Sequence, residues 1–560
     1  MEPPDVQIPF SDLPLSPPMG DLAQDDAGRL TAGLFAQGLL NLIPPPGSVE
    51  EDQRFNELQT RLSTLWKEVM HNPYAEQTVV VVPSLTLDVE EMHKLKGVTY
   101  YEERMLFHLI LLAMPKTRVV FVSSLPIHES IIDYLLQLLP GVPYSHARQR
   151  LHMFACYDGS IRPLTAKILE RPALIERIRR CIGNDQNAHL TAFNVTPLEK
   201  QLSVTLGVPL YGAHPRLLTY GLKSGARKLF RDLGLRFADG FEDLRDENDM
   251  AEATVELWRR DPSLKRLVVK LNDGFSGDGN GLVSLEKLQR AASRGPLSTR
   301  EALAVVKKTL PSSTRFQAKD QTWDSYVQKF RQMQGVVETF IEGRGKQSPS
   351  VQLRVNPLRQ VEIISTHDQI LGGPDGQVFV GCSFPALPTY CDALHDGARR
   401  IGETLADVGV LGRLSIDYLA VPDGKRTWKM YAIEINLRKG GTTHPFRTLQ
   451  LLTGGTYLPG EGRFKTASGK SKHYVASDNL ESEAYRGLTP EDLIDITTYT
   501  GLHYASSTNT GVVFHLIGAL SEFGKLGVTC IGNSAGEAQA LYDRTVATLD
   551  EQATTRAWMH

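Results

Sequence analysis

Four polar side chains lie near the ends of two apolar stretches of the sequence: Asp417 in the first, and Glu434, Asn436 and Arg438 in the second. A Pro-Asp-Gly turn signal at residues 422–424 separates the stretches, which predicts a β-hairpin. Side chains two residues apart share a face of a strand, so Glu434 and Asn436 are expected beside Asp417. Two carboxylates on one face repel unless a cation joins them, and Mg²⁺ commonly links such groups to nucleotide phosphates. The hairpin therefore predicts the metal site of an ATP-dependent enzyme, with a surface ladder of ion pairs as the alternative.

Arg438 shares this face, and its guanidinium is suited to bind a carboxylate or a transferring phosphoryl group. His444 follows in a glycine-containing loop and could act as an acid or base, although a histidine before proline is more often structural. Gln369, His367 and Arg354 are further candidate substrate contacts.

A glycine-rich stretch, residues 272–281, separates two expected strands at residues 266–271 and 281–285. Its glycines let backbone N–H groups approach phosphates closely. It is neither a Walker A loop nor a dinucleotide fingerprint, because no Gly-Lys-Ser/Thr closes it and a strand follows it. We expect a hairpin whose tip covers a triphosphate, with Lys270 directed at the phosphates. A plain flexible hairpin is the alternative.

Two further features are candidate nucleotide contacts when they are considered together with the glycine-rich hairpin and the carboxylate hairpin. Residues 336–343 are an apolar strand running into a turn, which can offer main-chain groups to an adenine edge; an ordinary buried strand is the alternative. Lys223 begins an expected helix, and Gly234 predicts the end of that helix because glycine is typical of a C-terminal cap. A lone lysine at a helix start is usually just solvated.

Bulk properties narrow the class of protein. A length of 560 residues predicts three or four units of ~150 residues each. The formal net charge of −3 argues against a nucleic-acid or membrane-surface binder. The five cysteines form no CxxC pair, as expected for thiols in a reducing cytosol. No apolar run reaches the ~18–20 residues of a membrane span, and the first residues lack the features of a signal peptide, so we expect a cytoplasmic protein.

Alternation of strands and helices marks the first half of the chain. Apolar strands are expected at residues 78–82, 118–123, 152–156 and 189–195, with helices between them. This alternation predicts a mainly parallel, doubly wound sheet. The turns after these strands carry no GxGxxG, so nucleotide binding is not expected there.

Taken in order, these motifs resemble the ATP-grasp superfamily over roughly residues 60–545. The matching features are Lys223, Lys270 with its glycine loop, the strand Glu338–Ile341, and the carboxylate hairpin. The Glu-x-Asn-x-Arg sequence is similar to the version in biotin carboxylase and carbamoyl-phosphate synthetase. Stretches at residues 365–373, 381–386 and 499–504 look like the peptide ligase of pheganomycin biosynthesis and its relatives.

The resemblance implies an α/β (α+β) protein with an ATP-grasp fold, an N-terminal doubly wound pre-ATP-grasp domain and a C-terminal lobe. The expected units are an extended arm (1–55), the pre-ATP-grasp domain (56–215), a small ATP-grasp subdomain with the flap (216–335), a large subdomain with the metal site (336–455) and the C-terminal lobe (456–560). It implies ATP and Mg²⁺ as cofactors. The implied nucleotide contacts are Lys223, Lys270, Ser276, Gly277, Gly279, Glu338, Thr339 and Ile341, the metal ligands are Asp417, Glu434 and Asn436, and the catalytic residues are Arg438 and Lys270.

The implied activity is that of a carboxylate–amine ligase, which forms an amide or peptide bond through an acyl phosphate and releases ADP and phosphate. The expected partners are a small-molecule carboxylate and an amine, such as amino acids or short peptides, without nucleic acid or membrane; a homodimer stays open. The alternatives are an ATP-binding scaffold or regulator without turnover, and a carboxylase or small-molecule kinase that uses the same site. Residue types do not identify the acid or the amine, because substrate pockets are built from loops.

Overall fold

The computed structural model describes residues 43–557 except 73, 88, 275–276, 278, 319–320, 374–375 and 425–426, together with the side chains up to residue 554. The features below all belong to the unit Pro45–His560. Most of the expected extended arm lies outside the described residues. The prediction of an extended arm is wrong for its last part, because residues 49–55 belong to helix α2 (Val49–Gln59). The Ser48 side chain accepts a hydrogen bond from Glu51 N and caps the start of this helix.

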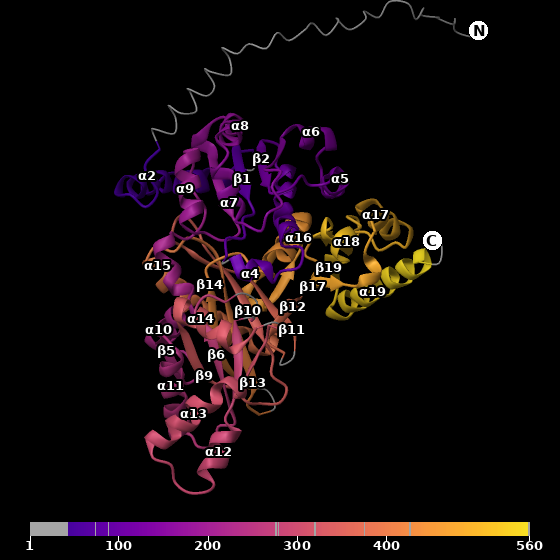
Figure 1. Cartoon of the computed structure of the whole chain (residues 1–560). Coiled ribbons are helices and arrows are strands. Elements are labelled where there is room, and N and C mark those ends of the chain that lie inside the picture. Colours follow the sequence, from indigo (N-terminus) through magenta and orange to yellow (C-terminus); the bar gives the residue numbers. More distant parts are fainter. Residues whose placement is uncertain are drawn as a thin grey trace, which may run out of the picture. The chain divides into compact units, whose positions relative to one another are not determined.

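Residues 77–192 contain a four-stranded parallel sheet in the order β3-β2-β1-β4. The predicted parallel sheet is therefore confirmed (Figure 1). Strand β1 is buried along its whole length, as its continuous apolar run predicts for a strand covered on both faces. The strands are β1 (Gln77–Val82), β2 (Thr117–Ser123), β3 (Leu151–Ala155) and β4 (Ala188–Ala192). The helical elements are α3 (Arg61–His71), α4 (Val89–His93), η1 (Val98–Ala113), α5 (Glu129–Gln137), α6 (Tyr144–Gln149), α7 (Leu164–Leu169), α8 (Pro172–Ile182), η2 (Asp185–Asn187), α9 (Pro197–Leu206) and η3 (Pro215–Gly221).

A five-stranded antiparallel sheet in the order β5-β9-β6-β7-β8 follows. We expected a boundary at residues 335/336, but β9 (Gly335–Thr339) pairs with β6 (Arg266–Leu271) and lies within this sheet. We keep the subdivision as a proposal, with the boundary after Thr339. The other strands are β5 (Gly240–Leu244), β7 (Asn280–Ser284) and β8 (Thr314–Phe316), and the helices are α10 (Lys223–Asp232), α11 (Glu247–Arg260), α12 (Glu286–Ala292), α13 (Thr299–Ser313) and α14 (Trp323–Met333).

The third sheet has eight antiparallel strands in the order β14-β13-β10-β11-β12-β17-β19-β18. Strands of the expected large subdomain and of the expected C-terminal lobe thus form one continuous sheet. Its strands are β10 (Pro349–Val355), β11 (Val361–Gly372), β12 (Val378–Phe384), β13 (Gly412–Pro422), β14 (Trp428–Asn436), β17 (His473–Glu481), β18 (Gly511–His515) and β19 (Lys525–Gly532). The accompanying elements are η4 (Pro388–Tyr390), α15 (Cys391–Asp407), α16 (Thr443–Thr453), β15 (Thr456–Leu458), η5 (Pro459–Glu461), β16 (Arg463–Lys465), η6 (Glu483–Tyr485), α17 (Pro490–Tyr499), α18 (Ala519–Phe523) and α19 (Ala535–Ala557).

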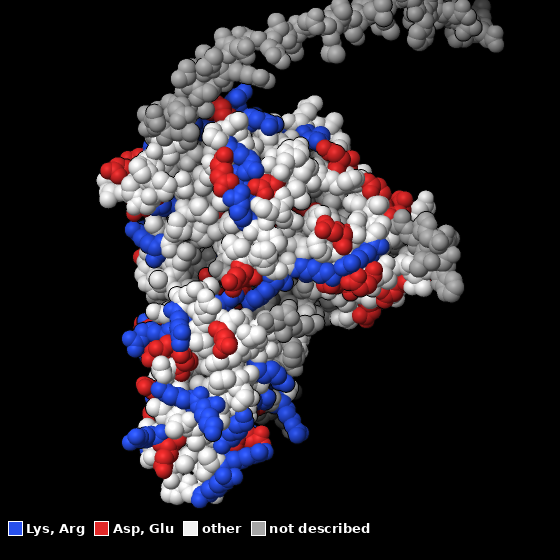
Figure 2. Space-filling model, in the orientation of Figure 1, with Lys and Arg blue, Asp and Glu red and all other residues white. Residues whose placement is uncertain are grey.

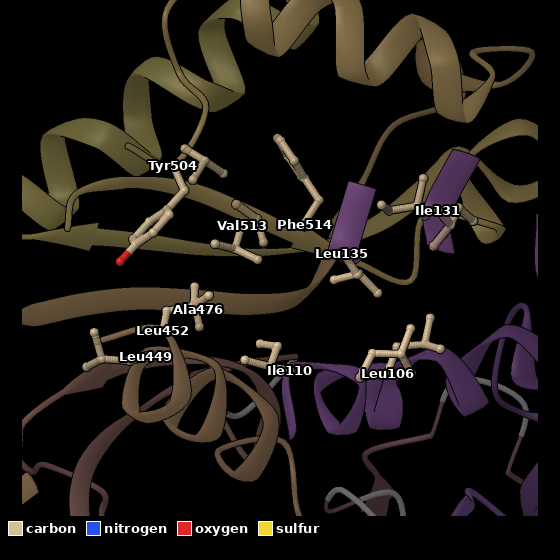
Figure 3. Close-up of a cluster of buried hydrophobic side chains, with 14 of the residues drawn as sticks. Leu106, Ile110, Ile131, Leu135, Leu449, Leu452, Ala476, Tyr504, Val513 and Phe514 are labelled. Atoms are coloured by element: carbon tan, nitrogen blue, oxygen red, sulfur yellow. The ribbon is translucent and has the colours of Figure 1, made fainter. Parts of the chain in front are cut away.

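One hydrophobic core joins the first part of the chain to the last. Leu106 and Ile110 of η1 share a buried cluster with Leu449 of α16 and with Val513 and Phe514 of β18, and Figure 3 shows Leu106, Ile110 and Leu449 on one side of the strand that carries Val513 and Phe514. Burying apolar area between distant segments stabilises their arrangement. This core therefore holds the N-terminal elements against the eight-stranded sheet.

The surface agrees with the balanced charge of the sequence. On the face shown in Figure 2, basic and acidic side chains are interspersed. Among the described residues, no helix combines the length and the apolar character needed to cross a bilayer.

Glu102, on η1, provides a test of the buried core. Burial raises its pKa from 4.5 to about 7, although Ser124 donates to it through N and Oγ, both at 2.6 Å. The folded protein therefore binds a proton between these pH values that the unfolded chain has released, and the free energy of unfolding falls by roughly 3 kcal/mol as pH rises through this window. Glu102→Gln is expected to remove this loss, so the stability difference between variant and wild type should grow from pH 5 to pH 8 in urea unfolding. The control is Glu252→Gln, at an exposed position, which should follow the wild type. If the free energy of unfolding changed equally with pH in Glu102→Gln and in wild type, the raised pKa of Glu102 would be contradicted.

Candidate nucleotide and metal site

A cavity of about 1000 Å³ lies between the five-stranded and eight-stranded sheets. Such a volume is at the upper end of small-molecule sites. It brings together the described residues that were predicted to contact the nucleotide or the metal, together with Arg438, whereas His444 is not among its lining residues and Ser276 lies outside the described residues. The predicted residues that line it are Lys223, Lys270, Gly277, Gly279, Glu338, Thr339, Ile341, Asp417, Glu434, Asn436 and Arg438.

The two carboxylates face each other across the predicted hairpin. Asp417 of β13 is the register partner of Glu434 of β14, and Asn436 donates from Nδ2 to Asp417 Oδ2 at 3.0 Å and to Glu434 Oε1 at 3.2 Å. Burial, and then the charge of Glu434, raise the pKa of Asp417. Burial also acts to raise the pKa of Glu434, but the adjacent Lys223 ammonium outweighs it and the pKa is lowered. Two half-buried carboxylates in contact with one amide fit a hard cation such as Mg²⁺.

Both predicted phosphate-binding lysines are held by carboxylates in the same cavity. Lys223 forms an ion pair with Glu434, and Lys270 Nζ lies 2.5 Å from Glu338 Oε2. Glu338 also accepts from Arg227 Nη1 at 2.6 Å. The Glu338 side chain therefore positions Lys270, a contact that the sequence did not reveal because the partners are on different strands.

Part of the predicted hinge is already engaged. Thr339 N donates to Asp239 O at 2.8 Å, so this amide is not available to an adenine edge. Ile341 O accepts from Lys346 Nζ at 3.0 Å, and both residues line the cavity. Phe340 N also donates, to Arg266 O at 3.4 Å. These main-chain groups are therefore engaged within the protein, and the expected hinge contacts to adenine stay a prediction.

The base of the glycine flap is tied to the start of α10. Lys223 N donates to Asn272 O at 3.1 Å, and Asn272 Oδ1 accepts from Ser224 N at 3.0 Å and from Ser224 Oγ at 2.7 Å. This buried tether couples the positions of Lys223 and Lys270, and the sequence analysis missed it. In the sequence, the feature that could have indicated this tether is the asparagine at the end of the strand, directly before the glycines.

The tip of the flap touches the eight-stranded sheet. Gly277 has φ of +86°, and a Cβ there would lie 2.3 Å from Gln377 O, so only glycine fits this contact. Asn280 Nδ2 donates to Gln377 Oε1 at 3.1 Å and adds a second link. The flap therefore covers the cavity by spanning from one sheet to the other.

The remaining candidates separate into two groups. Arg438 and Gln369 line the cavity, and burial lowers the pKa of Arg438. His367 is fully buried and contacts Tyr474 Oη at 2.7 Å. Arg354 forms an ion pair with Glu362. Of the candidate substrate contacts, only Gln369 therefore reaches the cavity.

The sequence analysis missed cavity residues that come from the far ends of the chain. Arg104 and Tyr101 of η1 line the cavity together with Lys525 of β19. Lys525 Nζ donates to Tyr101 Oη at 2.8 Å. Ser350 of β10 also lines the cavity and is the register partner of Asp417. No local motif marks these residues, because they meet only through the packing of distant segments.

Comparison with known proteins gives the same assignment. The family described as IQCH-like, ATP-grasp matches residues 217–458, and the PGM1 C-terminal domain matches residues 492–545. The chain is 28% identical over 457 residues to L-propargylglycine–L-glutamate ligase of Streptantibioticus cattleyicolor, covering 80% of this chain and 89% of that protein. It is 23% identical over 440 residues to IQ motif-containing protein H of Danio rerio, covering 72% of this chain and 41% of that protein.

Among solved structures, an ADP complex of N5-carboxyaminoimidazole ribonucleotide synthetase is similar with a TM-score of 0.46 and 12% identity, over 86% of this chain and 98% of that one. The matched family spans α10, the flap, the hinge and the carboxylate hairpin. The predicted resemblance is confirmed: residues 217–458 match the family described as IQCH-like, ATP-grasp, and most of the chain is similar to L-propargylglycine–L-glutamate ligase.

Proposed function

We propose that this protein is an ADP-forming ligase that joins a small-molecule carboxylate to an amine, both from the class of amino acids or short peptides. The observation that carries the proposal is the opposed pair Asp417 and Glu434, set with Lys223 and Lys270 in one cavity under a glycine flap. The name of the similar Streptantibioticus protein, a ligase of two amino acids, supports the substrate class.

Amide formation from a free carboxylate needs activation, because a carboxylate is a poor electrophile. Asp417, Glu434 and Asn436 would hold Mg²⁺, which neutralises phosphate charge when bound. Lys223 and Lys270 would exchange their carboxylate partners for oxygens of the ATP phosphates. Each such preorganised contact is typically worth ~3–4 kcal/mol at the transition state.

Arg438 would bind the substrate carboxylate and the acyl phosphate that forms from it. Arg438 is half-buried and lines the cavity, two residues beyond Asn436. The amine then attacks the acyl carbon, and the leaving phosphate carries away the carboxylate oxygen. The flap over the cavity keeps water from hydrolysing the acyl phosphate. We place the reaction in the cytoplasm, which suits five cysteines that are all free thiols.

A matrix assay of ADP release tests the proposal. Pairs of amino acids, with L-glutamate as the first amine, are incubated with MgATP, and the products are identified by mass spectrometry. The expected result is ADP release that requires both partners, with one amide formed per ADP. Turnover without an amine would identify a kinase, turnover only with bicarbonate a carboxylase, and nucleotide binding without ADP release a scaffold.

A further inference from the structure

Three side chains from different elements meet beside the cavity, outside the set used above. His444 is the second residue of α16, Asp478 lies in β17 and His515 ends β18. His444 Nε2 and His515 Nε2 are 2.8 Å apart, and they lie 2.9 Å and 2.8 Å from the same oxygen, Asp478 Oδ1. Their side chains are only 5%, 7% and 11% exposed, respectively for His444, Asp478 and His515. The three potential ligand atoms therefore form a compact, buried triangle.

No protonation state of the two histidines gives favourable contacts among all three atoms of this triangle. A ring nitrogen either carries a proton and donates, or presents a lone pair and accepts. Asp478 is held as a carboxylate by Arg104, whose Nη1 lies 3.3 Å from Oδ2. If both imidazoles donate to Oδ1, two N–H groups face each other across 2.8 Å. If only one nitrogen is protonated, the lone pair of the other faces the carboxylate oxygen.

A metal ion satisfies all three atoms at once. With sides of 2.8–2.9 Å, the centre of the triangle lies ~1.6 Å from each corner, and a metal with bonds of ~2.0–2.1 Å sits ~1 Å above its plane. Two imidazole nitrogens and one carboxylate oxygen are a donor set of first-row divalent transition metals, with further positions open. Arg104 on the second carboxylate oxygen orients the ligand, as outer-shell partners do.

The backbone is also shaped around the His515 ring. Gly527 of β19 is the register partner of His515, and a Cβ on it would lie 2.1 Å from His515 Nε2. Any other residue would push the ring out of the triangle. Leu516 follows with φ of 53°, a conformation that residues with a Cβ rarely adopt. Glu103 lines the same small hollow.

We propose that His444, Asp478 and His515 bind a divalent transition-metal ion, with Zn²⁺ as its simplest representative. The ion would fix the start of α16 to strands β17 and β18. The loop that contains Arg438 leads directly into α16, and Asp478 and Arg104 line the main cavity, so the ion would also stiffen that wall of the cavity. This site is separate from the Asp417–Glu434 pair and does not depend on the proposed ligase activity.

Zn²⁺ titration of the full-length protein tests the site. After dialysis against EDTA, and without ATP or Mg²⁺, calorimetry is expected to show one equivalent of Zn²⁺ bound and a higher Tm. His515→Gln and His444→Gln should each weaken binding by about 100-fold or more, since each removes one of three ligands. His503→Gln is the matched control, an exposed histidine in the same part of the chain. Glu434→Gln should leave Zn²⁺ binding unchanged, which separates this site from the magnesium carboxylates.

Co²⁺ substitution gives a readout that needs no variant. Visible absorption bands that reach saturation at one Co²⁺ per chain, and disappear when Zn²⁺ is added, are expected for wild type. Two results would overturn the proposal: no stoichiometric Zn²⁺ or Co²⁺ binding by wild type, or unchanged Zn²⁺ binding by both histidine variants.

Discussion

Lys270→Ala is expected to reduce ADP release by about 10²–10³-fold, the usual cost of losing one preorganised contact to the transition state. Lys270 is the next-to-last residue of β6, at the base of the flap, and its ammonium lies in the cavity beside Glu338. The variant keeps the Arg227–Glu338 contact at 2.6 Å, so Glu338 is not left as an unpaired buried charge. The fold should therefore survive, and circular dichroism checks this while coupled ADP assays measure the rate.

The control for this experiment is Lys329→Ala on α14. Lys329 is also a buried lysine, with Nζ 2.7 Å from Glu91 Oε1, and it lies outside the residues that line the cavity. Lys329→Ala should be less stable than wild type, but its rate of ADP release should not fall as it does in Lys270→Ala. Equal rates for Lys270→Ala and wild type would remove Lys270 from the mechanism.

Asp417→Asn is expected to have opposite effects on activity and on stability. It removes one of the two carboxylates from the proposed Mg²⁺ site, so ADP release should fall by about 10²-fold or more. In the absence of Mg²⁺ it also removes a like charge directly opposite Glu434. Because burial and Glu434 raise the pKa of Asp417, its ionised form destabilises the ligand-free protein. At pH 8.5, where Asp417 is ionised, the variant should be more stable by on the order of 2 kcal/mol.

Asp423→Asn is the matched control in the same hairpin. Asp423 is 51% exposed and lies 3.0 Å from Lys429 Nζ, so its loss should change neither rate nor stability appreciably. Urea unfolding with and without Mg²⁺ measures the effect, and added Mg²⁺ should stabilise wild type but not Asp417→Asn. A variant that is both less active and less stable than wild type without Mg²⁺ would show that Asp417 has a structural role.

The two parts of the fold that the sequence predicted best are local. The alternation of buried and exposed residues, with a turn signal between two strands, was enough to place Asp417 opposite Glu434. Continuous apolar runs separated by helices were enough for the parallel sheet β3-β2-β1-β4. In both cases the pattern lies within one strand or between neighbouring elements, where backbone geometry determines which side chains share a face.

Strand neighbours that are far apart in sequence were decided only by the tertiary structure. Periodicity shows which face of a strand is buried but not which strand lies beside it, so the sequence placed a boundary before β9 that its pairing with β6 does not respect. The same limit hid the joining of β12 to β17 in the eight-stranded sheet. Sheet order follows from how distant apolar faces pack, which no local pattern encodes.

By itself, then, the amino-acid sequence determined the chemical groups of the site: a carboxylate hairpin, a glycine flap between strands, and their resemblance to the ATP-grasp family. Only the tertiary structure decided the partner of each group. It pairs Lys270 with Glu338 and Lys223 with Glu434, and it gathers His444, Asp478 and His515 into a triangle. The physical reason is that ion pairs and ligand clusters act over a few ångströms, whereas their members lie tens to hundreds of residues apart and meet only when the sheets and helices pack.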